Sequence, residues 1–254
     1  MINYDFHDLS KRTDTELEQQ ITEGFTFGDY DSAENGMFLM SRDAPTPDEK
    51  EIVESVPYMQ GVYDYSSLEF DRYFNNREIT YQVMLFERDY SNRKIPEQDI
   101  KRRLMPLGVK TLYDSHDRGY HWRGKCKSVT VDDDADKGML SCTVIFDCYP
   151  LAIVNNTEGS DIWDDVYFPR WVFQDTKFVV TGIREVSVYN IGSTSIIPRI
   201  IVDSDFTIKS PTNTVTLAKG TYADAQLVLE RGENKLGLTG TGTIEFQFYR
   251  EEMI

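Results

Sequence analysis

The chain has 254 residues with 43 acidic and 27 basic side chains, which gives a formal charge of −16 at pH 7. This charge repels nucleic-acid phosphates and anionic lipid, so nucleic-acid binding is disfavoured. The sequence lacks the roughly 18 to 20 continuous apolar residues of a membrane span, and its first residues lack the basic and then apolar pattern of a signal peptide. We therefore expect a protein that stays in a cytosol-like setting until it assembles.

The composition favours strands. The chain contains 15 Tyr, 14 Phe and 3 Trp, and β-branched residues crowd its second half. Such residues suit the half-buried, pleated surface of a sheet. The length allows two domains that each bury a core. We predict a mainly β fold with a first domain at 1–154 and a second at 155–254.

The N-terminal part predicts little regular structure. Residues Thr13 to Glu16 have the spacing of a capping box, which fits either a short helix or a mobile arm. Short strands are predicted at 25–28 and 36–40. From Ser41 to Ser67 the chain has three prolines and few apolar repeats, which predicts an extended loop. This loop is either an arm around a neighbouring subunit or an ordinary surface excursion.

A hairpin is predicted after this loop. Apolar residues alternate over Leu68–Phe74 and again over Ile79–Leu85, and Asn75-Asn76 gives a turn between them. The opposite face of the second strand, from Thr80 to Phe86, is also too apolar for simple solvent exposure. We expect that face to be buried by a sandwich or by a neighbouring subunit.

One helix is predicted. Pro96 suits its first position, apolar residues follow at helical spacing, and Pro106 ends it. Asp99 and Arg103 are spaced for an ion pair between successive turns, worth a few tenths of a kcal/mol.

A long hairpin is predicted in the rest of the first domain. A strand at Leu112–Asp114 precedes it, and its two arms are Tyr120–Cys126 and Cys142–Cys148. The acidic residues 132–138 form its turn, and each arm would reach about 30 Å. Residues 155–161 then serve as the linker between the domains.

The second half predicts short strands separated by Gly, Asp and Asn turns. No helical period lies between them, so an antiparallel sandwich or jelly roll is expected. The predicted strands are 185–189, 198–202, 206–208, 214–217, 226–229 and 243–249.

Three cysteines, Cys126, Cys142 and Cys148, cannot all pair within one chain, and none forms a short metal-binding knuckle. They fit the buried face of strands as small residues.

No group of residues has a convincing metal or cofactor pattern. The acidic turn resembles half of a calcium loop, but Gly138 falls one position late and Thr143 stands where a bidentate Glu should close the shell. His116 and His121 lie near two aspartates, yet their spacing gives no common face for a metal or a general base. We predict no metal and no cofactor.

The sequence also lacks a nucleophile elbow, a phosphate-binding loop and a zinc-protease motif, so no catalytic residue is assigned and no enzymatic activity is predicted. A dense aromatic group fits either a core or docking surface or a sugar-stacking platform. It consists of Trp163, Tyr167, Phe168, Trp171 and Phe173, around Pro169-Arg170.

Short segments of the chain stand in the order found in a known family. They are Glu51 to Tyr58, Gly61, Asp64, Asn76 to Ile79, Leu112 to Asp114, Tyr120 to Lys127 and Phe146 to Pro150. In these segments the chain resembles the distal tail protein (Dit) of siphophages that infect Gram-positive bacteria, and its size suggests a lactococcal phage. In the second half, Asn190 to Gly192, Pro198 to Ile200 and Gly232 to Asn234 are similar to the galectin-like jelly roll of that family.

The resemblance implies a homohexameric ring of first domains, in which residues 41–67 form a belt that clasps the neighbouring copy, with jelly rolls projecting outward. It implies contacts with the tail tube protein, the tail-associated hub protein and a receptor-binding baseplate assembly, at the distal end of the virion tail. Assembly would take place in the host cytoplasm, and DNA would pass through a negatively charged lumen without specific binding. The alternatives are a carbohydrate-binding module that contacts host cell-wall saccharide, and a cell-wall hydrolase.

Overall fold

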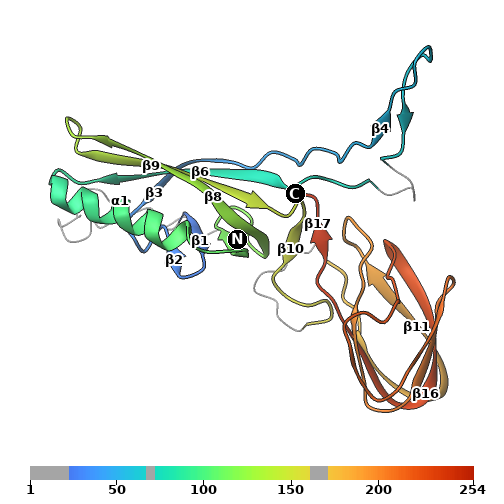
Figure 1. The fold of residues 1–254 in the computed structure, drawn as a ribbon. Coiled ribbons are helices and arrows are strands. Elements are labelled where there is room, and N and C mark those ends of the chain that lie inside the picture. Colours follow the sequence, from blue (N-terminus) through green and yellow to red (C-terminus); the bar gives the residue numbers. More distant parts are fainter. Residues whose placement is uncertain (1–22, 67–71, 161–170) are drawn as a thin grey trace, which may run out of the picture.

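A computed structural model describes residues 23–66, 72–160 and 171–254 (Figure 1). The fold is mainly β with one helix among the described residues, as predicted. A nine-stranded sheet in the first part and a six-stranded sheet in the second part each bury a separate apolar cluster. The capping-box segment that begins at Thr13 lies outside the described residues.

The first sheet has the strand order β2-β1-β7-β8-β9-β6-β3, and β10 joins it by pairing with β8 and β17. Its strands are β1 (Phe25–Phe27), β2 (Tyr30–Asp31), β3 (Phe38–Asp43), β6 (Arg77–Phe86), β7 (Lys110–Asp114), β8 (Tyr120–Asp134), β9 (Met139–Cys148), β10 (Ala152–Val154) and β17 (Glu251–Glu252). The predicted long hairpin is confirmed as β8 and β9. Its turn shortens to residues 135–138, and a register shift follows Cys126.

The core of the first sheet follows the alternation of the sequence. Ile79, Tyr81 and Val83 of β6 point inward and are buried, and the Tyr81 ring lies 4.7 Å from the Phe25 ring. Each such apolar side chain contributes roughly 1.5 to 3 kcal/mol on burial. All three cysteines are buried and free, as predicted.

The predicted hairpin between residues 68–74 and β6 is wrong. The sheet neighbours of β6 are β3 and β9, and the only described pairing of the earlier segment is a bridge from Phe74 to Glu49. Residues 68–71 lie outside the described part of the chain. Alternation in a sequence indicates a strand but does not name its partner, and the adjacent turn signal was misleading.

The outer face of β6 is not buried within one chain. Gln82 is exposed, and the Phe86 side chain is 63% exposed. The prediction that a second layer of a sandwich covers this face is therefore wrong for the described residues. Burial of the face by a neighbouring subunit stays a prediction.

The helix α1 (Tyr90–Leu104) ends before Pro106 as predicted but begins six residues before Pro96. Asp89 caps it, because its Oδ1 accepts hydrogen bonds from the backbone N–H groups of Ser91 at 2.8 Å and Asn92 at 3.3 Å. Pro96 therefore lies inside the helix, where its missing N–H removes one backbone hydrogen bond near the first turn. The predicted ion pair of Asp99 with Arg103 is present at 3.3 Å.

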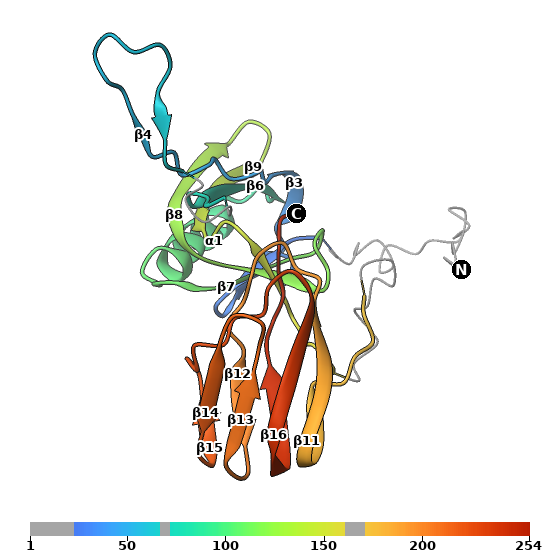
Figure 2. The same ribbon diagram turned by 90° about the vertical axis from the view of Figure 1, so that its right-hand side faces the viewer.

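The second sheet is organised around one long strand, β16. The whole of β11 pairs with it (Figure 2). On the other edge of β16, β13 and then β12 pair with successive segments. The strands are β11 (Lys177–Asn190), β12 (Arg199–Val202), β13 (Phe206–Lys209), β14 (Thr214–Leu217), β15 (Gly220–Tyr222) and β16 (Gly232–Gln247).

Most predicted strands of the second half are confirmed, but the one at 226–229 is wrong. Only Leu229 pairs there, in an isolated bridge to Ile196. The prediction also missed the first two thirds of β16, because glycines interrupt its apolar alternation. Gly240 is required by packing, since a Cβ there would lie 2.7 Å from the backbone carbonyl oxygen of Asp205.

A buried ion cluster lies where the chain passes between the two sheets. Nε of Arg250 lies 2.6 Å from Oε1 of Glu158, and its Nη1 lies 3.3 Å from Oε1 of Glu252. Strand β17, which contains Glu252, pairs with β10 of the first sheet. Because the chain returns to the first sheet at its end, the division into 1–154 and 155–254 stays a prediction.

Candidate assembly surface

Residues 44–66 and 72–76 form a long projection from the first sheet, which we call the arm (Figures 1 and 2). Strands β4 (Val53–Glu54) and β5 (Tyr63–Asp64) pair in it. Lys50 N–H donates to the Tyr73 carbonyl and Tyr65 N–H to the Ile52 carbonyl, both at 2.8 Å. The predicted extended loop is therefore present from residue 44 on as a thin two-stranded ribbon, but its predicted start is wrong, because Ser41 to Asp43 belong to β3.

The arm exposes many apolar side chains. Eight of them are between 41% and 109% exposed: Ile52, Val53, Val56, Tyr58, Val62, Tyr63, Tyr65 and Tyr73. An isolated two-stranded hairpin is marginally stable in water, and a contiguous apolar surface of this kind marks an interaction site. The described residues of the arm therefore form no core of their own, and these side chains stand in solvent in a single copy.

Arg77 fixes the root of the arm. Its side chain is only 2% exposed and donates hydrogen bonds to the carbonyls of Ala44 at 2.5 Å and Ile254 at 2.8 Å. Its guanidinium carbon lies 4.4 Å from the centre of the buried Trp122 ring, in cation–π geometry. One side chain thus ties the start of the arm, the strand that follows it and the last residue of the chain. Sequence reasoning missed this role, because a single Arg at a strand start has no distinctive pattern.

His116 and His121 contact different partners, as their spacing predicted. Nδ1 of His116 lies 3.2 Å from Oδ1 of Asp114 and 3.5 Å from Oγ of Ser115. A nucleophile relay places the hydroxyl and the carboxylate on opposite ring nitrogens, whereas here both meet the same nitrogen. His121 is separate and contacts Oδ1 of Asn155 at 2.8 Å.

Asp114 on β7 instead links its own strand to β3 at one edge of the first sheet and to β6 beside it. Its carboxylate accepts a hydrogen bond from the Tyr81 hydroxyl at 2.6 Å and from the guanidinium of Arg42, which also pairs with Asp117. Burial, together with the Asp114 charge, raises the pKa of Tyr81 well above its ordinary value. Because Arg42 lies on β3 and Asp114 on β7, the network links two strands that are not neighbours in the sheet.

The acidic turn of the long hairpin is organised by an ion pair. Oδ2 of Asp134 lies 2.8 Å from Nζ of Lys137, and its Oδ1 accepts the Lys137 N–H at 3.1 Å. Within the described ranges, no group of three or more His, Cys, Asp or Glu side chains is arranged to hold a metal ion. No helix in the same ranges is long and apolar enough to cross a membrane.

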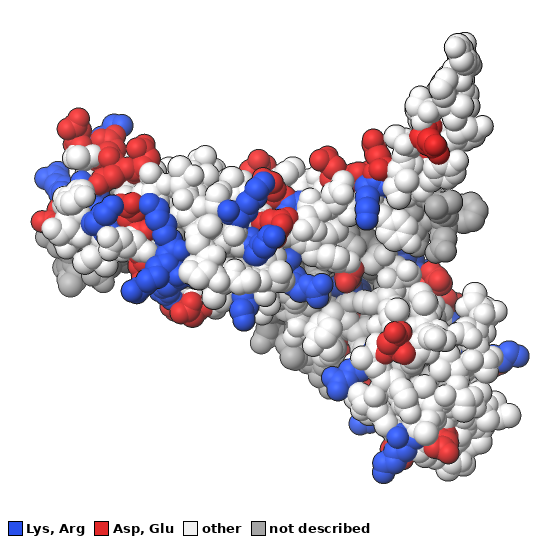
Figure 3. Space-filling model, viewed as in Figure 1, with Lys and Arg blue, Asp and Glu red and all other residues white. Residues whose placement is uncertain are grey.

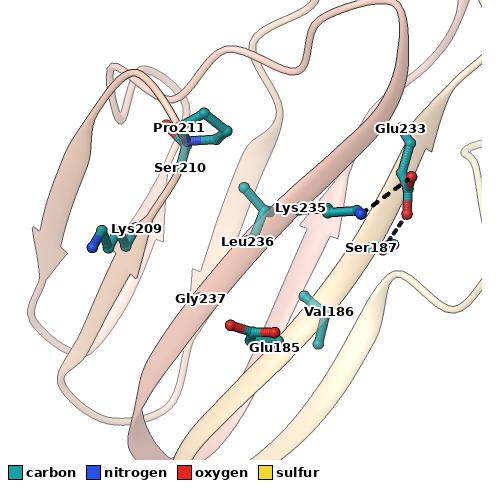
Figure 4. A pocket seen from close by; sticks show the side chains of 10 residues that line it. All are labelled: Glu185, Val186, Ser187, Lys209, Ser210, Pro211, Glu233, Lys235, Leu236 and Gly237. Atoms are coloured by element: carbon teal, nitrogen blue, oxygen red, sulfur yellow. Dashed lines mark hydrogen bonds and ion pairs between the residues drawn. The ribbon is translucent and has the colours of Figure 1, made fainter.

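A groove of 560 Å³ lies on the second sheet between β11, β16 and the end of β13 (Figure 4). Glu233 in the groove accepts a hydrogen bond from Ser187 Oγ at 2.8 Å and lies 3.9 Å from Lys235 Nζ. Val186 and Leu236 are its apolar lining, and no described aromatic ring lines it. The groove therefore offers no flat surface for a sugar ring to stack on.

Most of the aromatic group predicted as a core or sugar platform, including Trp163, lies outside the described residues. Of its described members, Trp171 lies under the guanidinium of Arg250, with 5.5 Å from the guanidinium carbon to the ring centre, and Phe173 is largely exposed. The choice between a docking role and a sugar-binding role for this group stays open.

No family model and no curated protein matches the sequence. Among solved structures, the chain is similar to the Dit protein of phage SPP1, described as a paradigm of the hub adsorption apparatus in phages that infect Gram-positive bacteria. The TM-score is 0.64 at 13% identity, over 89% of this chain and 98% of that chain. The baseplate of phage P2, in an activated conformation with Ca, matches with a TM-score of 0.38 at 10% identity, over 87% and 92%, which is too weak a likeness for argument. The chain has the fold of a Dit protein.

Proposed function

We propose that this protein is a structural hub of a phage tail, in which identical copies assemble into a closed ring through their arms. The observation that carries the proposal is the arm, which exposes eight apolar side chains on a Dit fold. A protein that worked alone would leave this surface in water, at the risk of aggregation. An interface that joins a projection of one copy to a different surface of the next is heterologous, and such an interface gives a ring when its rotation closes on the first copy.

In this role the ring has six copies and connects the tail tube to the baseplate at the distal end of the virion tail. Its partners are the tail tube protein, the tail-associated hub protein and a receptor-binding baseplate assembly that the second sheet anchors. The ring forms in the host cytoplasm. With a charge of −16 on each chain, the lumen lets DNA pass without specific binding.

The proposed role is non-enzymatic. The contacts of Asp114 with Arg42 and Tyr81 serve the sheet itself, and His116 has no nucleophile on its second ring nitrogen among the described residues. A carbohydrate-binding role for the second sheet stays a prediction without a specific observation in its favour.

Electron microscopy of the purified protein tests the proposal. Closed rings with a central opening are expected, and labelled antibody should place the protein at the distal end of tails in intact virions. Separate single copies in every field at high protein concentration would contradict the ring.

A further inference from the structure

The outer face of α1 carries an uncovered apolar surface. The Ile95 side chain on this face is 67% exposed, and Tyr90 at the start of the helix is 60% exposed. The opposite face packs on the first sheet through Ile100 and Leu104. The helix therefore has apolar residues on both faces, whereas a helix on the surface of a single copy normally has a polar outer face.

The charges of α1 and of the arm are opposite. Residues 90–104 contain five basic and two acidic side chains, within a chain that is strongly acidic overall. Residues 44–66 contain five acidic side chains and one lysine. Figure 3 shows Lys and Arg at the end of the molecule that carries α1, beside a separate group of Asp and Glu at the same end. Opposite charges of this kind steer two surfaces together and set their register.

The two surfaces also match in length and cannot meet within one copy. Each limb of the arm between Ile52 and Tyr65 has about seven residues and spans about 23 Å, and α1 with 15 residues spans about 22 Å. The arm and α1 lie at opposite ends of the molecule (Figure 1). A contact between them therefore joins two copies head to tail.

We propose that the arm of one copy docks on the outer face of α1 of the next copy, with its tyrosines and valines against Ile95 and its acidic residues near Arg102. This assignment of the acceptor surface rests on the proposed ring. Arg102 is suited to the contact because its side chain is 81% exposed, and its described ion pair, with Asp99 at 3.3 Å, is on the surface of the same helix. Surface pairs of this kind contribute little stability and are easily rearranged.

Cross-linking between copies tests the acceptor surface. Val53→Cys, Val56→Cys and Tyr63→Cys are each combined with Ile95→Cys and treated with a short bis-maleimide. The native cysteines are buried and do not compete. At least one combination should give covalent dimers and higher ladders. The control pairs the same arm cysteines with Ile183→Cys on β11, which is 78% exposed and should give none.

The solution mass of the same samples separates the two proposals. A ring-sized mass without cross-links to position 95 would overturn the acceptor assignment and leave the ring intact. A monomeric mass at all concentrations would overturn both.

A charge exchange gives a second readout. Glu54→Lys and Arg102→Glu should each weaken assembly by about three- to tenfold, and the two together in one chain should recover most of the loss. Arg102→Ala controls for the effect of a Glu near the helix C-terminus on the helix itself. Strictly additive losses in the double variant would contradict a contact between the arm and α1.

Discussion

The first sheet and the arm use the same kinds of residue with opposite results. Tyr81 and Val83 of β6 are buried against neighbouring strands, whereas Tyr63 and Val53 of the arm stand in solvent. Both segments are extended and rich in β-branched and aromatic residues. The difference is the number of neighbours, because β6 lies between two strands and each strand of the arm pairs with only one. Burial thus depends on how many strands and side chains pack on a segment, and within a single copy the arm has too few of them.

Removal of the arm should have the largest effect on assembly, and it separates the role of the arm from that of the first sheet. Deletion of residues 45–75, with a short glycine linker in their place, should leave the first sheet folded, because Asp43 already pairs with Thr80 beside the junction. We expect a monomer by sedimentation with little change in the free energy of unfolding. A matched variant that keeps the arm but carries Ile183→Ser on the second sheet should still form rings. A deleted protein that still forms rings would refute the role of the arm.

The next largest effect, on the free energy of unfolding, is expected from the loss of Arg77 at the root of the arm. Arg77→Ala removes two hydrogen bonds and the stacking on Trp122 from a buried site, so we expect a loss of about 3 kcal/mol in the free energy of unfolding. The control is Arg72→Ala in the arm, whose pair with Glu49 is exposed to solvent and should contribute little to stability. Denaturant unfolding measures both. Equal losses for the two variants would show that Arg77 is not a structural clamp.

Alkaline pH should weaken the first sheet. Burial raises the pKa of Cys126 to about 11 and those of Cys142 and Cys148 to about 12. These thiols are protonated in the fold and ionise near pH 9 when unfolded, so their contribution is full below pH 9 and is lost as pH rises toward 11 to 12. Each thiol adds a slope of at most about 1.4 kcal/mol per pH unit.

Cys142→Ala tests this slope. Between pH 9 and 11 its free energy of unfolding should fall less steeply with pH than that of the unmodified chain, by about one thiol's share. The native thiols should also resist a thiol reagent at pH 8. Rapid labelling of all three in the folded protein would contradict their burial.

The smallest effect on the free energy of unfolding is expected from the loss of the hydrogen bond between Tyr81 and Asp114. Tyr81→Phe removes the hydroxyl that donates to Asp114 and should cost about 1 to 2 kcal/mol, because a buried acceptor loses a partner. Tyr90→Phe on the exposed start of α1 should change the free energy of unfolding by less than about 0.5 kcal/mol. Thermal unfolding of the two variants side by side checks the difference.

Sequence reasoning worked where local pattern and fold agree. The alternation over β8 and β9, with an acidic turn between them, predicted the long hairpin, because a strict period of two is typical of strands that bury one face. It failed where a strand pairs with a strand that is distant in the sequence, or where a single residue decides where an element begins. The cap at Asp89 moved the start of α1 ahead of Pro96, and glycines hid most of β16.

The candidate site was predicted only in part. The extended character of residues 41–67 was readable from its prolines and charges, and its role came from the resemblance to Dit proteins. The anchoring by Arg77 was not readable, because it depends on Ala44, Trp122 and Ile254, which are far apart in the sequence. That the protein comes from a lactococcal phage stays a prediction.

Amide hydrogen exchange in the arm is the most direct test of the claim that a neighbouring copy, and not an internal core, holds the arm in place. In a single copy the arm has few backbone hydrogen bonds and exposed apolar side chains, so its amides should exchange fast. In assembled protein the account predicts strong protection across residues 50–66, which disappears on dilution to single copies. Fast exchange of these amides within a ring of full mass would contradict it.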